Sequence, residues 1–113
     1  MIKFSSVVDS ITFEKIRAGT KTVKFYLCDD KHSSLLSGDC FVLINNSKKL
    51  IVRAQSIATS KNLKNLIESF SLQKLGEDNY SDAYLNVKQW FSDEKLKKYS
   101  VMAVSVEIFN GQD

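Results

Sequence analysis

The sequence contains no proline and only four glycines in 113 residues. The absence of proline excludes a proline-rich linker, and we find no internal repeat and no low-complexity tract. We therefore expect residues 1–113 to form a single domain, which is the usual size for one core. Metal-ligating residues are equally scarce, because the two cysteines and His32 share no ligand-type spacing. The sequence thus predicts no metal site, and it indicates no cofactor.

Long apolar runs are also missing. No segment approaches the roughly 18 apolar residues of a membrane span, and residues 1–6 lack the apolar stretch of a secretory signal. We therefore expect a cytoplasmic protein with no membrane partner, in which Cys28 and Cys40 stay reduced. The net charge of +3 is mildly basic, so a nucleic-acid partner is allowed but not required.

The apolar residues that are present follow short periodic patterns. They predict strands over residues 1–6, 22–28, 40–44, 50–59 and 99–109, the last of them central in the sheet. They also predict a helix that begins at Asp9 or Ser10 and ends at Gly19, and later helices that begin at Ser60, Ser81 and Ser92. Helices and strands do not alternate regularly. We therefore expect an α+β fold whose mixed or antiparallel sheet forms a closed or half-closed barrel with flanking helices.

The positive charge is concentrated in residues 15–24. This segment contains Lys15, Arg17, Lys21 and Lys24, and the only acidic residue beside it is Glu14. A phosphate group responds to charges within about a Debye length, roughly 8 Å at physiological salt. The segment is therefore the first candidate for an anion-binding surface.

Three segments together resemble the ASCH domain family. Residues 13–23 resemble its opening helix, Gly-Thr-Lys-Thr turn and strand, and residues 36–43 are similar to its Gly-Asp turn before a buried strand. Residues 90–104 resemble its late helix end and closing strand. The resemblance covers nearly the whole chain and implies a PUA-like fold, a small β-barrel with flanking helices. It also implies a cleft near the turn at residues 19–22 and a role in binding RNA. Some members hydrolyse acetylcytidine nucleosides, and ribonuclease activity has been suggested for others.

The resemblance leaves the enzyme question open. In the acetylcytidine hydrolases of the family, the lysine that matches Lys21 works with a threonine three residues later and with a glutamate ahead of the late helix. Here the threonine position holds Lys24, and many members have glutamate there and arginine at the position of Tyr26. Glu77 is the best match to the catalytic glutamate, and Asp78 fits almost as well.

The residues of the basic segment allow two interpretations. A desolvated Lys21 could act as a base or a proton donor, whereas a solvated one would be a compact cation for phosphate or a turn residue without function. Thr22, Lys24 and Tyr26 share one face of the expected strand, because residues two apart project the same way. Lys24 and Tyr26 could therefore flank one ligand, with the ring stacked on a base, or could belong to a solvated face.

Three residues outside the segment also allow more than one interpretation. Arg53 lies in mid-strand and needs a partner, which could be a ligand phosphate or an acid such as Glu77, Asp78 or Glu107. His32 could act as a general acid or base, or could pair with Asp30, although an ordinary surface loop is favoured. Trp90 has helical spacing with Tyr84 and Phe91, which favours a place in the core.

The sequence thus supports three hypotheses. The first is an RNA- or nucleotide-binding module that uses Lys21, Thr22, Lys24, Tyr26 and Arg53. The second is a hydrolase of a modified nucleoside, or a ribonuclease, with Lys21 as base, Glu77 as its partner and Lys24 stabilising negative charge. The third is a protein-interaction domain without a nucleic-acid role.

Overall fold

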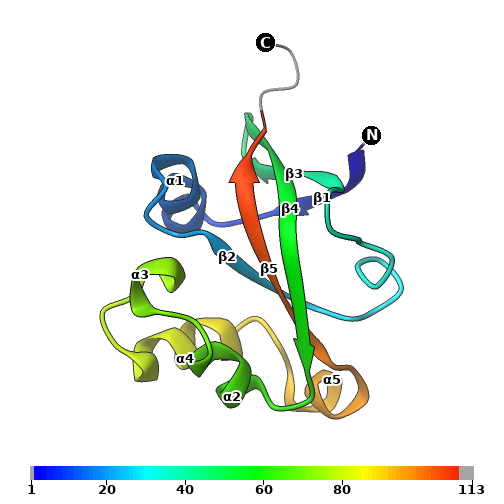
Figure 1. The fold of residues 1–113 in the computed structure, drawn as a ribbon, viewed down its shortest axis with the longest axis vertical. Coiled ribbons are helices and arrows are strands. Elements are labelled where there is room, and N and C mark those ends of the chain that lie inside the picture. The colour runs from blue at the N-terminus through cyan, green and yellow to red at the C-terminus, as the bar shows by residue number, and fades with distance from the viewer. Residues whose placement is uncertain (1, 110–113) are drawn as a thin grey trace.

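The computed structural model describes residues 2–109, so residues 1 and 110–113 of the expected domain lie outside the described part (Figure 1). The elements in that part follow the order β1 (Ile2–Val7), α1 (Ser10–Ala18), β2 (Val23–Leu27), β3 (Cys40–Asn45), β4 (Lys48–Ser60), α2 (Leu63–Glu68), α3 (Leu72–Leu75), α4 (Tyr80–Lys88), α5 (Asp93–Lys98) and β5 (Val101–Ile108). The expected α+β class is confirmed.

The five strands form one curled sheet in the order β1-β3-β4-β5-β2. β1 and β3 are parallel, and the other neighbours are antiparallel, so the sheet is mixed. β5 pairs with β4 and β2, which confirms its predicted central place. The sheet curls into a half-barrel that does not close, since β1 and β2 each have one paired neighbour (Figure 1).

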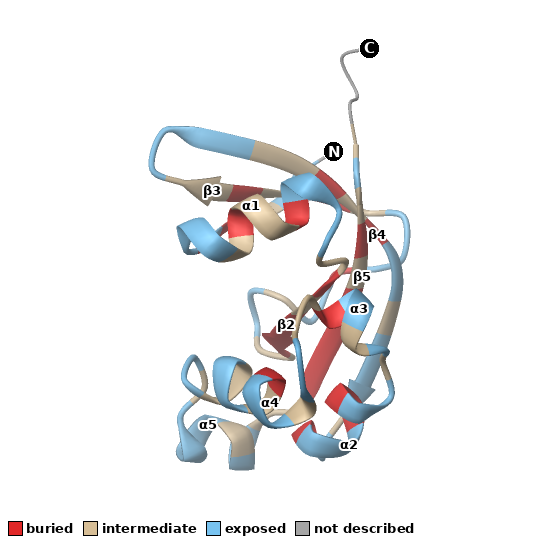
Figure 2. Cartoon of the chain, turned by 90° about the vertical axis from the view of Figure 1, so that its left-hand side faces the viewer, coloured by how far each residue is buried: buried red, intermediate tan, exposed pale blue. Residues whose placement is uncertain are grey.

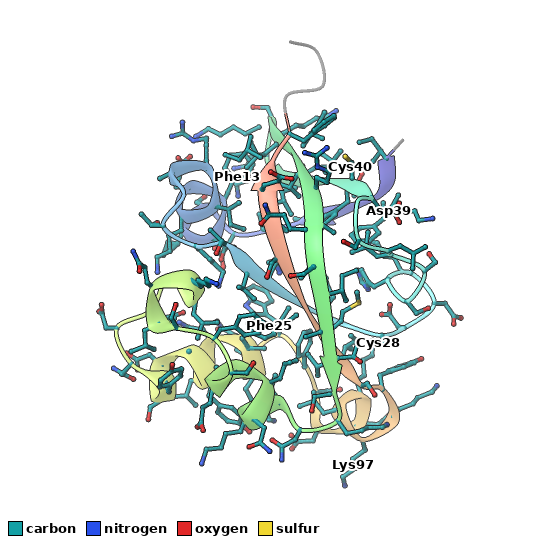
Figure 3. The ribbon with its side chains drawn as sticks, in the orientation of Figure 1. Phe13, Phe25, Cys28, Asp39, Cys40 and Lys97 are labelled. Atoms are coloured by element: carbon teal, nitrogen blue, oxygen red, sulfur yellow. The ribbon has the colours of Figure 1, made fainter. Side chains whose placement is uncertain are left out.

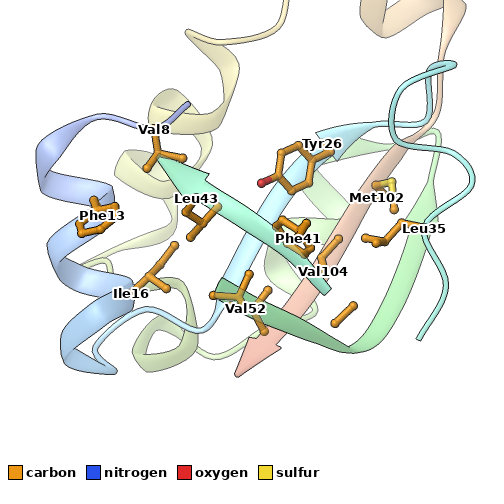
Figure 4. Packing of buried hydrophobic residues seen from close by; sticks show 12 residues of the cluster. Val8, Phe13, Ile16, Tyr26, Leu35, Phe41, Leu43, Val52, Met102 and Val104 are labelled. Atoms are coloured by element: carbon orange, nitrogen blue, oxygen red, sulfur yellow. The ribbon is translucent and has the colours of Figure 1, made fainter. Parts of the chain in front are cut away.

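Two hydrophobic cores lie on opposite faces of the sheet. In the first, Phe13 and Ile16 of α1 pack toward Phe41 and Leu43 of β3 (Figure 4). In the second, helices α2, α3 and α4 cover β2 and β5 at the other end of the molecule (Figure 2). β2 serves both cores, because Val23, Phe25 and Leu27 enter the second and Tyr26 enters the first. The face that carries Tyr26 is therefore not the solvated face that the sequence allowed.

The helix ends are partly as expected. Asp9 caps α1, Gly19 ends it in the left-handed conformation at φ 82°, and Ser92 caps α5. The predicted caps Ser60 and Ser81 are wrong.

In their places Asn62 caps α2 and Asn79 caps α4. Ser60 is still paired with β5, so the helix cannot begin there, and Ser81 already lies inside α4. The sequence also missed α3, because one helical turn is too short to show a 3.6-residue period.

The two cysteines lie in different parts of the sheet (Figure 3). Cys40 is in β3, Cys28 follows β2, and both are free thiols. Within residues 2–109, no helix is long and apolar enough to cross a membrane. In the same residues, no group of three or more His, Cys, Asp or Glu side chains is placed to hold a metal ion.

Truncation of Phe41 tests the first core. Its fully buried ring lies 4.9 Å from the ring of Phe4 and 5.9 Å from that of Tyr26, so Phe41→Ala would leave a cavity. We expect the free energy of unfolding in urea to fall by about 3–5 kcal/mol. Leu36→Ala, at an exposed residue, is the control and should change it by less than about 0.5 kcal/mol. Equal effects of the two substitutions would contradict this packing.

Candidate functional site

A cleft of about 550 Å³ opens at the gap between the two edge strands. One side is formed by the end of β1 and the start of α1, and β2 contributes the middle. The other side comes from the end of α3 and from α4 with the residues that follow it. The cleft thus lies between β1 and β2, the two strands between which the half-barrel fails to close. The helices that contribute to its lining come from opposite ends of the molecule, α1 from one end and α4 from the other (Figure 2).

Of the six catalytic and binding residues proposed from the sequence, four line the cleft, namely Lys21, Lys24, Tyr26 and Glu77. His32 and Trp90 line it as well. Asp78 is exposed and does not line it, so the structure distinguishes the two neighbouring acids.

Thr22 and Arg53 do not line the cleft either. Thr22 borders a separate, smaller groove. Arg53 Nε donates to Glu107 Oε2 at 2.9 Å, and the guanidinium lies 5.0 Å from the ring centre of Phe109. Arg53 is therefore half of a cross-strand ion pair, one of the partners expected for it, and is not a cleft residue.

The end of α3 holds Lys21 in place. Lys21 Nζ donates to the carbonyl of Leu75 at 3.0 Å, and Lys15 Nζ donates to that of Gly76 at 2.8 Å. The backbone N–H of Thr22 donates to the carbonyl of Lys74 at 2.9 Å. The last carbonyls of a helix lack partners within the helix and carry partial negative charge, so ammonium groups stabilise them.

Gly76 permits this close approach. Its φ is 69°, in the left-handed region, and a Cβ there would lie 3.0 Å from both Lys21 Cβ and the carbonyl oxygen of Thr20. A side chain would therefore push α3 away from the turn. Glycine at residue 76 therefore lets the end of α3 lie directly against the turn that carries Lys21.

Lys21 and Glu77 influence each other electrostatically without a direct contact. Burial lowers the pKa of Lys21, and the charge of Glu77 partly opposes this shift. Glu77 Oε2 accepts a hydrogen bond from Asn86 Nδ2 at 2.7 Å. Among the ion pairs of residues 2–109 there is none between Lys21 and Glu77, because the Lys21 ammonium is bound to Leu75.

Lys24 is the half-buried cation without a partner. Burial, followed by the positive charge of Lys21, lowers the pKa of Lys24 to about 8, and the charge of Asp9 acts in the opposite direction. Lys24 Nζ lies 4.7 Å from the ring centre of Tyr26. Within residues 2–109, Nζ makes no hydrogen bond and no ion pair, so its charge is compensated only by this ring and by more distant carboxylates.

Tyr26 is not the stacking platform that the sequence allowed. Its side chain is only 5% exposed, and its hydroxyl donates to Ser6 Oγ at 3.0 Å across the gap between the edge strands. The ring of His32 stacks on it with ring centres 4.7 Å apart. His32 is fixed by Asp29 at 2.7 Å, and not by the expected Asp30. A ligand base therefore has no free face of Tyr26 on which to stack.

Trp90, and not Tyr26, is the exposed aromatic residue of the cleft. Its side chain is 64% exposed and lines the cleft together with the exposed apolar side chains of Val7 and Ile11. The expectation that Trp90 belongs to the core is wrong. The residue follows the end of α4, where helical spacing no longer sets the direction of a side chain.

No family model and no curated protein matches the chain. Solved structures of other proteins share its fold. The crystal structure of hypothetical protein PH0355 has a TM-score of 0.82 at 22% identity and covers 94% of this chain and 98% of its own. The solution NMR structure of protein PF0455 from Pyrococcus furiosus has a TM-score of 0.73 at 21% identity and covers 95% and 97%. These likenesses establish a common fold and assign no activity.

Alanine at Gly76 tests the coupling between α3 and Lys21. Gly19 also has a positive φ but no atom near the position of a Cβ, so Gly19→Ala is a matched control for backbone strain. We expect Gly19→Ala to lower the free energy of unfolding by about 1 kcal/mol. Gly76→Ala should lower it by roughly 1–3 kcal/mol more, through the added crowding, and should shift the backbone NMR signals of residues 20–22. Equal losses for the two variants would contradict the close contact.

Proposed function

We propose that the cleft binds a nucleotide, either free or as one unit of an RNA chain, with its phosphate at Lys24 and Lys21 and its base beside Trp90. The observation that carries the proposal is the half-buried ammonium of Lys24, which has no anionic partner within residues 2–109. The cleft volume of about 550 Å³ falls within the usual range for small-molecule sites.

The phosphate assignment follows from the cost of an uncompensated charge. A cation removed from water is unfavourable unless it is paired, and Lys24 is further opposed by the charge of Lys21. A phosphate placed between the two ammonium groups would relieve both penalties, and lysine is a common point-charge ligand of phosphate. One of these lysines, Lys21, belongs to the Gly-Thr-Lys-Thr turn on which the resemblance to the ASCH family partly rests.

Different residues of the cleft could contact the base and the sugar of the nucleotide. Base stacking on an aromatic side chain contributes about 1–3 kcal/mol, and Trp90 offers an exposed ring in the cleft lining. The carboxylate of Glu77 is an acceptor for sugar hydroxyls or for a base amino group. Lysines for the phosphate and a carboxylate for the hydroxyls together fit a nucleotide better than a simple anion.

The pH dependence of nucleotide binding tests the role of Lys24. Binding requires the charged form, and the pKa of Lys24 in the free protein is about 8. Affinity for cytidine monophosphate should therefore be full below this pKa and should fall as the pH rises through it. The phosphate itself keeps its charge in that range, because its second pKa is about 6. Trp90 is the only tryptophan, so its fluorescence reports binding directly.

Lys24→Gln should weaken binding of this nucleotide about tenfold, equal to about 1.4 kcal/mol, and should leave binding of unphosphorylated cytidine unchanged. Lys49→Gln is the control, because Lys49 is exposed and does not line the cleft. Equal affinities for cytidine and its monophosphate, or equal effects of the two substitutions, would refute the proposal.

A second candidate is hydrolysis of an acetylated cytidine, in line with the ASCH resemblance. The observation in its favour is that Lys21 and Glu77 line the same cleft and that burial lowers the pKa of Lys21. Lys21, with Glu77 as its partner, would move the proton of the attacking water, and Lys24 would stabilise the negative charge that develops on the carbonyl oxygen. The hydroxyl found in the related hydrolases is absent, because Lys24 takes its position.

Substitution of the two neighbouring acids tests this candidate. If acetylcytidine is hydrolysed, Glu77→Gln should reduce turnover by about 10²–10⁴-fold, as expected for loss of a general acid–base group. Asp78→Asn is the control and should keep full turnover, because Asp78 lies outside the cleft. Release of acetate can be followed by NMR. The absence of any turnover by the unmodified protein would eliminate the hydrolase and leave the binding proposal standing.

A further inference from the structure

We propose that Lys24 is also a nucleophilic amine, which forms an imine with an aldehyde or ketone that carries an anionic group and binds in the cleft. The proposal rests on the placement of this side chain and is independent of the nucleotide assignment. Lys24 projects from the edge strand β2 into the cleft, beside the charge of Lys21.

Lys24 differs in its contacts from Lys15 and Lys21. It differs in burial from Lys31, the exposed fourth lysine of the cleft lining. The ammonium groups of Lys15 and Lys21 donate to backbone carbonyls at 2.8 and 3.0 Å, so their positions and protons are held by α3. Within residues 2–109, the Lys24 nitrogen has neither a hydrogen-bond acceptor nor a carboxylate in bonding distance, and its close neighbour is the ring of Tyr26. Its lone pair is therefore free to attack once the proton has left.

The surroundings favour the neutral amine. Removal from water and a second cation nearby are the two conditions that activate a lysine as a Schiff-base nucleophile. Both act on Lys24 and bring its pKa to about 8. At pH 7 roughly a tenth of this amine is unprotonated, whereas an exposed lysine with a pKa of about 10.4 is almost entirely protonated.

The reaction balances without an oxidant or reductant. The neutral nitrogen of Lys24 forms a bond to the carbonyl carbon, and as the nitrogen gives up one proton the carbonyl oxygen takes up one, which gives a neutral carbinolamine. The C–O bond then breaks, the oxygen leaves as water with a second proton, and the product is a protonated imine. Lys21 and Glu77 line the same cleft and are the groups available to exchange these protons. The positive charge of Lys21 beside Lys24 would attract a ligand with a carboxylate or phosphate.

Reductive alkylation with glyoxylate and sodium cyanoborohydride tests the proposal, because the hydride traps any imine as a stable adduct. Digestion and mass spectrometry then give the rate at each lysine, with the exposed Lys49 as an internal reference. At about pH 7.5, Lys24 should react about tenfold faster than Lys49, since far more of it is neutral. The rate at Lys24 should level off above a midpoint near pH 8, whereas that at Lys49 should keep rising.

Formaldehyde serves as a second probe that carries no charge. With it, the labelling rate of Lys24 should have the same pH midpoint, but the ratio of this rate to that of Lys49 should be smaller. Lys24→Arg should remove the fast adduct and keep the circular-dichroism spectrum. A rate at Lys24 no higher than at Lys49, or a profile that rises to about pH 10 like that of an ordinary lysine, would overturn the proposal. Fast labelling without nucleotide binding would refute only the proposed function, and nucleotide binding without fast labelling would refute only the imine.

Discussion

The hydrogen bond from Lys21 Nζ to the carbonyl of Leu75 is the interaction on which the rest of the site depends. It joins the turn after α1 to the end of α3, and so connects the two ends of the molecule that have separate cores. Hydrogen bonds to charged groups contribute about 1.5–3 kcal/mol each, and the parallel contact from Lys15 to Gly76 adds a second. Together they hold Lys21 and Glu77 in one cleft.

The open seam of the half-barrel explains why a cleft exists there at all. β1 and β2 approach each other through the hydroxyls of Tyr26 and Ser6 but form no ladder, so the sheet leaves a gap that α1 and α4 border. A closed barrel would bury this edge, whereas an open one leaves space for a ligand next to it. Lys24 is half-buried because its strand forms the edge of that gap.

Much of this arrangement could be predicted from the sequence, since local signals specify it. The turn at Gly19, the strand that follows and the central place of β5 all come from residue type and period. The sequence could not show that Tyr26 is buried and that Trp90 is the exposed aromatic residue of the cleft. Both faces of β2 are covered by elements that are distant in the sequence. Glu77 and Asp78 are adjacent, and only the docking of α3 decides which of them reaches the cleft.

The central claim is that Lys24 is a half-buried amine without a partner, because both proposed uses of the cleft begin from that state. The most direct measurement is an NMR titration of the lysine side-chain carbon and nitrogen signals, with Lys24 assigned through the Lys24→Arg variant. We expect a pKa of about 8 for Lys24 in the free protein. A pKa of about 10.4, the value of an exposed lysine, would contradict it.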